Sequence, residues 1–168
     1  LGDVYKRQQQ TEVSLYHPEE KVRQEASDYV SLMTPVAKSL FTDLAMEITS
    51  DAMQIYGGYG YTKDQGIEQL YRDNRITPIY EGTNSVQAAD LVFRKLSNKN
   101  GNIIDKFLEQ VKSECNSNNE KIEPFISEFN NYLSTLKKFS NWMIDKAKTQ
   151  KDDVSAAANA YLKTLGYV

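Results

Sequence analysis

The helical spacing of apolar residues constrains the fold of this chain more than any other feature. Apolar side chains recur every three or four residues at Val36, Leu40, Leu44, Ile48, Ala52 and Ile55. A second long stretch, from Ile122 to Met143, keeps the same period. Such spacing places the apolar residues on one face of an amphipathic α-helix. Because no useful length of sequence alternates with the period of a strand, we expect an all-α fold, a helical bundle.

Local signals predict where the first of these helices begin and end. Residues 18–20, Pro-Glu-Glu, are expected to open a helix that reaches about Met33, since an acidic first turn suits the helix dipole. Thr34 and Pro35 are expected to start a second helix, because threonine is a good N-cap and proline at the first helical position loses no needed N–H. Gly57-Gly58 is expected to end it.

The rest of the sequence is divided in the same way. Glycines and Pro78 break residues 57–84 into short segments around one helix from Ile67 to Arg75, and a further helix is expected from Ser85 to Leu96. The turn-rich residues 98–102 form the predicted boundary between a part at 9–97 and a helical extension at 103–168. The extension is expected to contain helices from Ile103 to about Cys115, over the Ile122–Met143 stretch, and up to Leu165 with Asp152-Asp153 as its cap.

Composition excludes several classes of protein. The 20 Lys and Arg against 23 Asp and Glu leave a charge of −3, which provides no electrostatic footprint for nucleic acid or anionic lipid. No apolar run approaches the roughly 20 residues of a membrane span. His17 has no metal-ligand spacing to a partner, so no metal site is expected. Cys115 is the single cysteine, which favours a reducing, cytoplasmic location.

The two ends of the sequence do not resemble natural termini. The chain starts at Leu1, and residues 1–8 are similar to the adapter read-through found in assembled environmental sequence. We therefore set residues 1–8 apart as a non-native candidate and interpret the chain as a fragment of a longer protein.

Two motifs in the middle of the chain have ordinary structural explanations when each is taken alone. Residues 54–61, Gln-Ile-Tyr-Gly-Gly-Tyr-Gly-Tyr, form a glycine-rich turn that could approach a phosphate, but they lack the Walker and dinucleotide-binding spacings. A helix C-cap is the favoured interpretation. Residues 71–75, Tyr-Arg-Asp-Asn-Arg, favour a structural ion-pair network.

A third motif, at residues 79–84, places a carboxylate at a predicted helix start. Burial of Glu81 beside Tyr80 would raise its pKa, whereas the helix N-terminus would favour the anion. A glutamate so placed is either a helix cap or a general base.

Together and in order, these motifs resemble the C-terminal helical domain of the acyl-CoA dehydrogenases. The resemblance covers roughly residues 17–97 and rests on Gln54–Tyr61, Tyr71–Ile76 and Ile79–Asn84. Residues 32–38 and 87–95 are similar to the branch that carries a C-terminal helical extension, which includes 3-methylmercaptopropionyl-CoA dehydrogenase-like proteins. The implied fold is the helical domain of this family followed by most of that extension.

The resemblance also implies an activity, an FAD-dependent α,β-dehydrogenation of an acyl-CoA thioester, as in fatty acid β-oxidation. Glu81 would be the catalytic base that removes the α-proton while the β-hydrogen leaves as hydride to the flavin, and Gly82 would lie along the substrate. Thr83, Asn84 and Ser85 would contact FAD. The FAD of a neighbouring subunit in a homo-oligomer would be met by Gln54, Ile55, Tyr56, Gly57 and Gly58. Electron-transfer flavoprotein would be the electron acceptor.

Two alternatives remain open at the level of sequence. Residues 103–168 would serve as an assembly module without activity if their aromatic stripe, Phe125, Phe129, Tyr132, Phe139 and Trp142, needed a partner helix. The whole protein would otherwise be an acyl-CoA oxidase-like relative. Even if the intact protein is a dehydrogenase, the isolated chain is expected to bind FAD poorly and to show no turnover.

Overall fold

The computed structural model describes residues 2–97, 102–115 and 123–168, and over these ranges it contains helices and turns without strands. The all-α prediction is confirmed. The helices are α1 (Gly2–Tyr16), α2 (Glu20–Tyr56), α3 (Ile67–Asn74), α4 (Asn84–Asp90), α5 (Asn102–Cys115), α6 (Glu123–Lys146) and α7 (Lys151–Gly166). Short 3-10 helices follow α2 at Gly57–Tyr61 and Lys63–Gln65, and a π-helical segment at Leu91–Leu96 continues α4.

Helix α2 is one continuous helix of 37 residues, so the predicted break at Thr34-Pro35 is wrong. Thr34 does not cap a helix; its hydroxyl donates to the Val30 carbonyl at 2.6 Å, one turn back. Pro35 lies inside the helix, where a proline removes one backbone hydrogen bond and costs about 3 kcal/mol. Its neighbours Leu32 and Val36 are fully buried, and their packing offsets the loss.

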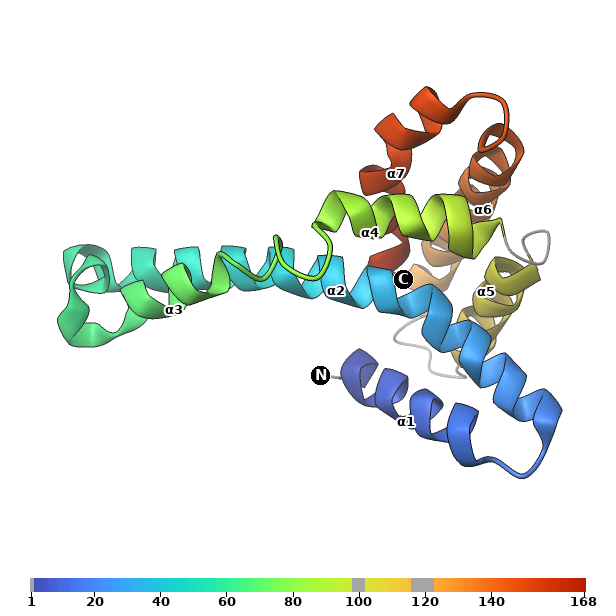
Figure 1. Cartoon of the computed structure of the whole chain (residues 1–168), viewed down its shortest axis with the longest axis horizontal. Helices are drawn as coiled ribbons and strands as arrows, with labels where there is room; N and C mark the ends of the chain where they lie inside the picture. Colours follow the sequence, from blue (N-terminus) through green and yellow to red (C-terminus); the bar gives the residue numbers. More distant parts are fainter. Residues whose placement is uncertain (1, 98–101, 116–122) are drawn as a thin grey trace.

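The two halves of α2 have different surroundings. Val36 and Leu40 are buried in the core, whereas Ile48 is 65% exposed and Ile55 is 84% exposed. The apolar stripe expected to be buried along the whole helix therefore leaves the core partway. Figure 1 shows the second half of α2 running away from the other helices, with α3 folding back along it. We call this projection, residues 48–78, the arm.

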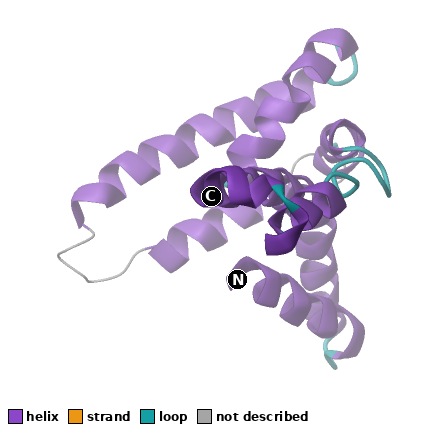
Figure 2. Ribbon diagram, turned by 90° about the vertical axis from the view of Figure 1, so that its left-hand side faces the viewer, coloured by secondary structure: helices purple, strands orange, loops and turns teal. Residues whose placement is uncertain are grey.

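The remaining helices form a body around one hydrophobic core. Its buried residues come from α2, α4 and its π-helical continuation, α5, α6 and α7, and include Leu32, Val36, Leu91, Val92, Leu96, Ile104, Leu136, Met143, Tyr161, Leu162 and Leu165. Figure 2 shows the helices of the body from the side on which the arm projects, with the arm nearest the viewer. Residues before and after the predicted boundary thus share the same core.

Helices α6 and α7 are joined by hydroxyl groups as well as by apolar packing. Tyr161 is fully buried, and its hydroxyl lies 2.8 Å from the Ser140 hydroxyl, which also hydrogen-bonds the Leu136 carbonyl. Burial raises the pKa of Tyr161, and its hydrogen bond with Ser140 opposes that shift in part. Tyr132 donates to the Thr164 carbonyl at 2.7 Å. Of the stripe that motivated the assembly alternative, Phe129, Tyr132 and Phe139 are partly buried, whereas Phe125 is 67% and Trp142 37% exposed.

Most of the other predicted boundaries lie within two residues of those observed. The expected helices from Ile67 and from Ser85 correspond to α3 and to α4 with its continuation, and α5 begins one residue before Ile103. Helix α7 begins at Lys151, so Asp152 and Asp153 lie in its first turn and do not cap it. The boundary predicted at 98–102 falls largely outside the described residues.

Helix α1 packs against α2 and contains residues 2–8. Lys6 Nζ lies 2.6 Å from Glu114 Oε2 of α5. Hydrogen bonds from Lys6 and then Gln110 lower the pKa of Glu114. The non-native origin suggested for residues 1–8 stays a prediction. No helix among the described residues is long and apolar enough to cross a membrane.

Candidate active site

The backbone around Glu81 adopts a conformation that side chains with a Cβ atom rarely take. Glu81 has φ of 54° and Gly82 has φ of 85°, so two consecutive residues are left-handed. Glu81 is the only residue other than glycine with positive φ in the described ranges. A left-handed residue of this type costs about 1–2 kcal/mol and persists where the surroundings hold it. We call residues 79–83 the Glu81 turn.

Helix α2 holds the Glu81 turn through one lysine. Lys38 Nζ donates to the Gly82 carbonyl oxygen at 2.8 Å and to Asn84 Oδ1 at 2.8 Å. Asn84 Nδ2 in turn donates to Asp43 Oδ1 at 2.7 Å and to Thr42 Oγ1 at 3.0 Å. These four side chains, Lys38, Thr42, Asp43 and Asn84, form the Lys38–Asn84 network. Charge-assisted hydrogen bonds of this kind are roughly twice as strong as neutral ones.

The start of α4 supplies the other constraints on the turn. Thr83 is the N-cap of α4, and its hydroxyl accepts from the Val86 N–H at 3.3 Å. Gln87 Nε2 donates to the Glu81 carbonyl at 3.1 Å. The turn is therefore fixed from two sides, by α2 and by the first turns of α4.

Helix α7 reaches the same place from the C-terminal end of the chain. Lys163 Nζ lies 3.3 Å from Asp43 Oδ2, and Asn159 Nδ2 donates to the Ser85 hydroxyl at 3.3 Å. Glycine at 166 permits the close approach of α7 to α2, because a Cβ there would lie 3.0 Å from Leu40 Cδ2 and 3.2 Å from Val36 Cγ1. The predicted extension thus contacts the residues that hold the Glu81 turn.

The Glu81 carboxylate itself is exposed, and nothing in the described part of the chain donates a hydrogen bond to it. Tyr80 is also 48% exposed. The burial of Glu81 beside Tyr80 that the sequence suggested is absent from this chain, because no described segment covers the turn. The Glu81 backbone N–H likewise has no acceptor among the described residues. Both groups are free to meet a ligand.

The glycine-rich motif lies at the tip of the arm, away from the Glu81 turn. Gln54, Ile55, Tyr56, Gly57 and Gly58 are all exposed. Gly57 ends α2 with φ of 58°, as predicted, and its N–H donates to the Gln54 carbonyl. Lys38 and Gln54 are separated by roughly 24 Å along the helix axis. One chain therefore does not bring the two predicted cofactor-contacting sets together.

In place of the ion-pair network expected at residues 71–75, the described residues show one ion pair between an exposed Arg72 and a partly buried Glu68. Arg72 Nη2 lies 3.7 Å from Glu68 Oε1, one turn earlier on α3. Such a surface pair contributes little to stability.

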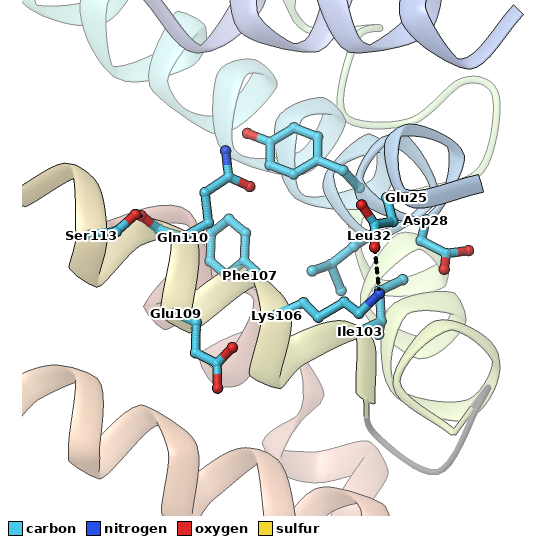
Figure 3. A pocket seen from close by; sticks show the side chains of 10 residues that line it. Glu25, Asp28, Leu32, Ile103, Lys106, Phe107, Glu109, Gln110 and Ser113 are labelled. Carbon is cyan, nitrogen blue, oxygen red and sulfur yellow. Dashed lines mark hydrogen bonds and ion pairs between the residues drawn. The ribbon is translucent and has the colours of Figure 1, made fainter. Parts of the chain in front are cut away.

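A hollow between α2 and α5 is distinct from the Glu81 turn. It has a volume of about 460 Å³, and its wall includes Glu25, Leu32, Lys106 and Phe107 (Figure 3). Lys106 Nζ donates to Glu25 Oε1 at 3.0 Å across it, and that hydrogen bond lowers the pKa of Glu25. No residue of the Glu81 turn lines this hollow.

The sequence singled out Glu81 as a candidate, but it did not indicate the side chains that hold its turn. Lys38 and Thr42 are one helical turn apart, which is the spacing of polar neighbours on one helix face. That spacing indicates a shared face but not the partner, since Asn84 lies far along the chain. No sequence pattern pointed to Asp43, Asn159 or Lys163 as neighbours of the Glu81 turn.

Comparison with known proteins identifies the class to which this fold and this site belong. The family model for the acyl-CoA dehydrogenase C-terminal domain matches residues 3–96, more than half of the chain. The chain belongs to the acyl-CoA dehydrogenase family. The match includes both the arm and the Glu81 turn.

Individual relatives agree with this assignment. Over 95 residues the chain is 40% identical to 3-methylmercaptopropionyl-CoA dehydrogenase of Ruegeria pomeroyi, a match that covers 56% of this chain and 16% of that protein. Over 110 residues it is 32% identical to butyryl-CoA dehydrogenase of Syntrophomonas wolfei, covering 66% of this chain and 18% of the relative. The chain thus spans less than a fifth of the length of these curated relatives.

A solved structure extends the similarity to the fold. Caenorhabditis elegans ACDH-11, crystallised in complex with C11-CoA, superposes with a TM-score of 0.71 at 25% sequence identity. The superposition covers 84% of this chain and 24% of ACDH-11. It therefore reaches beyond the residues that the family model matches.

Proposed function

We propose that this chain is the C-terminal part of an FAD-dependent acyl-CoA dehydrogenase and that Glu81 is the catalytic base. One observation carries the proposal: an unpaired, exposed carboxylate lies on a left-handed turn that α2 and α4 hold, within the region matched by the family model. Two curated relatives are named for their action on acyl-CoA thioesters, which supports the same class of substrate.

Each group of the Glu81 turn has a role in this reaction. The carboxylate takes the α-proton of the thioester, and the unpaired Glu81 N–H binds the thioester carbonyl, which makes that proton more acidic. Gly82 lets the acyl chain pass close to the backbone. Other segments of the full-length protein cover the turn and exclude water, and a carboxylate in a dry site is a stronger base.

The residues present fit FAD in part. Bound FAD would supply the acceptor for the β-hydrogen of the substrate, which would leave as hydride. Thr83 and Ser85 are exposed at the start of α4 and are available to contact it. The Asn84 carboxamide is not, because both its oxygen and its nitrogen are engaged with α2. We therefore assign the Asn84 side chain to the anchoring of the turn and retain Thr83 and Ser85 as cofactor contacts.

The tip of the arm is proposed to meet the FAD of a neighbouring subunit in a homo-oligomer. Its exposed apolar surface supports this role, because Ile55 is 84%, Tyr59 73% and Tyr61 79% exposed. The proposal includes electron-transfer flavoprotein as the acceptor and a cytoplasmic location in fatty acid β-oxidation.

Replacement of Glu81 in the full-length enzyme tests this function. We expect Glu81→Gln to slow anaerobic reduction of the flavin by butyryl-CoA or 3-methylmercaptopropionyl-CoA by about 10²–10⁴-fold, the usual contribution of a general base. The exposed Glu128→Gln on α6 is the matched control and is expected to react at the wild-type rate. Wild-type flavin reduction in Glu81→Gln would disprove the base assignment. Hydrogen peroxide formation during turnover in air would favour the oxidase-like alternative.

A further inference from the structure

We propose that Lys38 is a positioning residue for catalysis, acting through the geometry of the Glu81 turn. This inference rests on the proposed function of Glu81. The ammonium group of Lys38 donates to the carbonyl of Gly82 and to the side-chain oxygen of Asn84, with both distances at 2.8 Å. Lys38 thereby connects the residue after the proposed base to the first residue of α4.

The need for such a residue comes from the backbone of Glu81. A left-handed glutamate is disfavoured because its Cβ crowds the following carbonyl group, so a free loop would relax to another conformation. Relaxation would turn both the Glu81 carboxylate and its N–H away from their present directions. Lys38 opposes this change by fixing the carbonyl of Gly82, at the point where the left-handed pair ends.

The surroundings keep the ammonium group of Lys38 in place. Asn84 cannot turn away, because its amide nitrogen is bound by Asp43 and Thr42 of the same helix. Asp43 is held in turn by Lys163 of α7 at 3.3 Å. Lys38 thus has a fixed partner in Asn84, at the start of α4, and a fixed target in the Gly82 carbonyl on the turn.

A lysine is better suited to this position than a residue with one donor. Its three N–H groups satisfy the Gly82 carbonyl and the Asn84 oxygen at the same time, and neither acceptor carries a charge. Lys38 makes no contact with the Glu81 carboxylate, so its effect on the reaction is indirect. Its loss should therefore lower the rate of proton removal more than it lowers the affinity for substrate.

Lys38→Met in the full-length enzyme is the direct test, since methionine keeps an unbranched stem and removes the donors. We expect flavin reduction at saturating acyl-CoA to slow by about 10–100-fold, the effect of an ångström-scale misplacement, with a small change in substrate Kd. Lys38→Gln, which retains a donor, should recover part of the rate. Lys138→Met, an exposed lysine of α6, is the control. An unchanged rate in Lys38→Met would overturn the inference.

A double variant separates positioning from a general structural defect. If Lys38 acts through Glu81, adding Lys38→Met to Glu81→Gln should slow flavin reduction no further, because the group that was positioned is already gone. If the fold-reductions in flavin-reduction rate of the two single variants multiply in the double variant, the inference is overturned, even if both single variants are slow. A different outcome would disprove the proposed function itself: reduction of the flavin by acyl-CoA at the wild-type rate in the Glu81→Gln single variant.

Discussion

Two left-handed residues in succession, Glu81 and Gly82, give the candidate site its shape. Gly82 adopts φ of 85° without a steric penalty, because it has no Cβ. The left-handed conformation is destabilising for Glu81, which has a Cβ. The hydrogen bonds from α2 to the Gly82 carbonyl and from α4 to the Glu81 carbonyl offset this cost. At this scale the backbone, more than any side-chain contact, determines where the proposed base points.

Substitution of Gly82 measures how strictly the turn is constrained. A Cβ at Gly82 would be strained by the positive φ and would lie 3.2 Å from Gln87 Nε2. We expect Gly82→Ala to lower the free energy of unfolding by more than about 1 kcal/mol. Gly58→Ala is the control, since its φ is not left-handed and nothing lies within 4 Å of its Cβ position. Urea unfolding measures the free energy of unfolding of both variants. Equal stability of Gly82→Ala and Gly58→Ala would contradict the predicted strain at Gly82.

Pairs of helices, rather than single residues, determine how the body is held together. The buried hydroxyls of Ser140 and Tyr161 join α6 to α7, and α7 joins α2 through Asp43 and Lys163. A buried tyrosine in such a contact must remain protonated, because its anion would lose solvation. The contact therefore makes the stability of α7 depend on pH in alkaline solution.

Burial raises the pKa of Tyr161 above its ordinary value of 10.0 in the folded protein. The contribution of Tyr161 is fully present below pH 10 and is lost as the pH rises, because the unfolded chain releases this proton first. We expect the free energy of unfolding to fall by up to about 1.4 kcal/mol per pH unit above pH 10. Tyr161→Phe should flatten this dependence and cost about 0.5–1.5 kcal/mol at neutral pH.

Denaturant unfolding followed between pH 8 and 11 is the measurement for Tyr161, and Tyr59→Phe is its control. Tyr59 is 73% exposed at the tip of the arm and should leave the pH dependence unchanged. Tyr132, whose pKa burial also raises, remains in both variants and leaves a residual slope. An identical alkaline slope in Tyr161→Phe and the wild type would refute the assignment.

The whole molecule consists of a body with a shared core and an arm that projects from it (Figure 1). The arm carries exposed apolar side chains over α2, the 3-10 helices and α3, among them Ile48, Ile55, Tyr59, Tyr61 and Leu70. A surface of this composition is typical of a protein–protein contact. The proposed homo-oligomer would cover it.

A charge at the tip of the arm tests that contact in the full-length enzyme. We expect Ile55→Asp to reduce the oligomer size in light scattering and to lower the ratio of bound flavin to protein, because an aspartate buried in an interface loses solvation. Leu15→Asp, at a residue of α1 that is 63% exposed, should change neither quantity. Retention of both the oligomer and the flavin in Ile55→Asp would exclude the arm tip as a subunit contact.

Much of this architecture could be predicted from the sequence, and the exceptions have physical causes. Apolar periodicity and glycine stops located α3 and α5 because those signals are local. The break at Pro35 was wrong because burial of Leu32 and Val36 outweighs a local preference for helix starts. The Lys38–Asn84 network could not be predicted, since it depends on how α2 and α4 pack.

The shared core has a consequence for how this protein could be shortened in evolution. Leu91, Val92 and Leu96 belong to the same hydrophobic core as Tyr161 and Leu162. A stop codon after residue 97 would therefore expose these apolar side chains to water. We expect such a shortened polypeptide to aggregate through this exposed surface. We therefore expect α7 and the residues that it covers to change in concert among relatives that carry both.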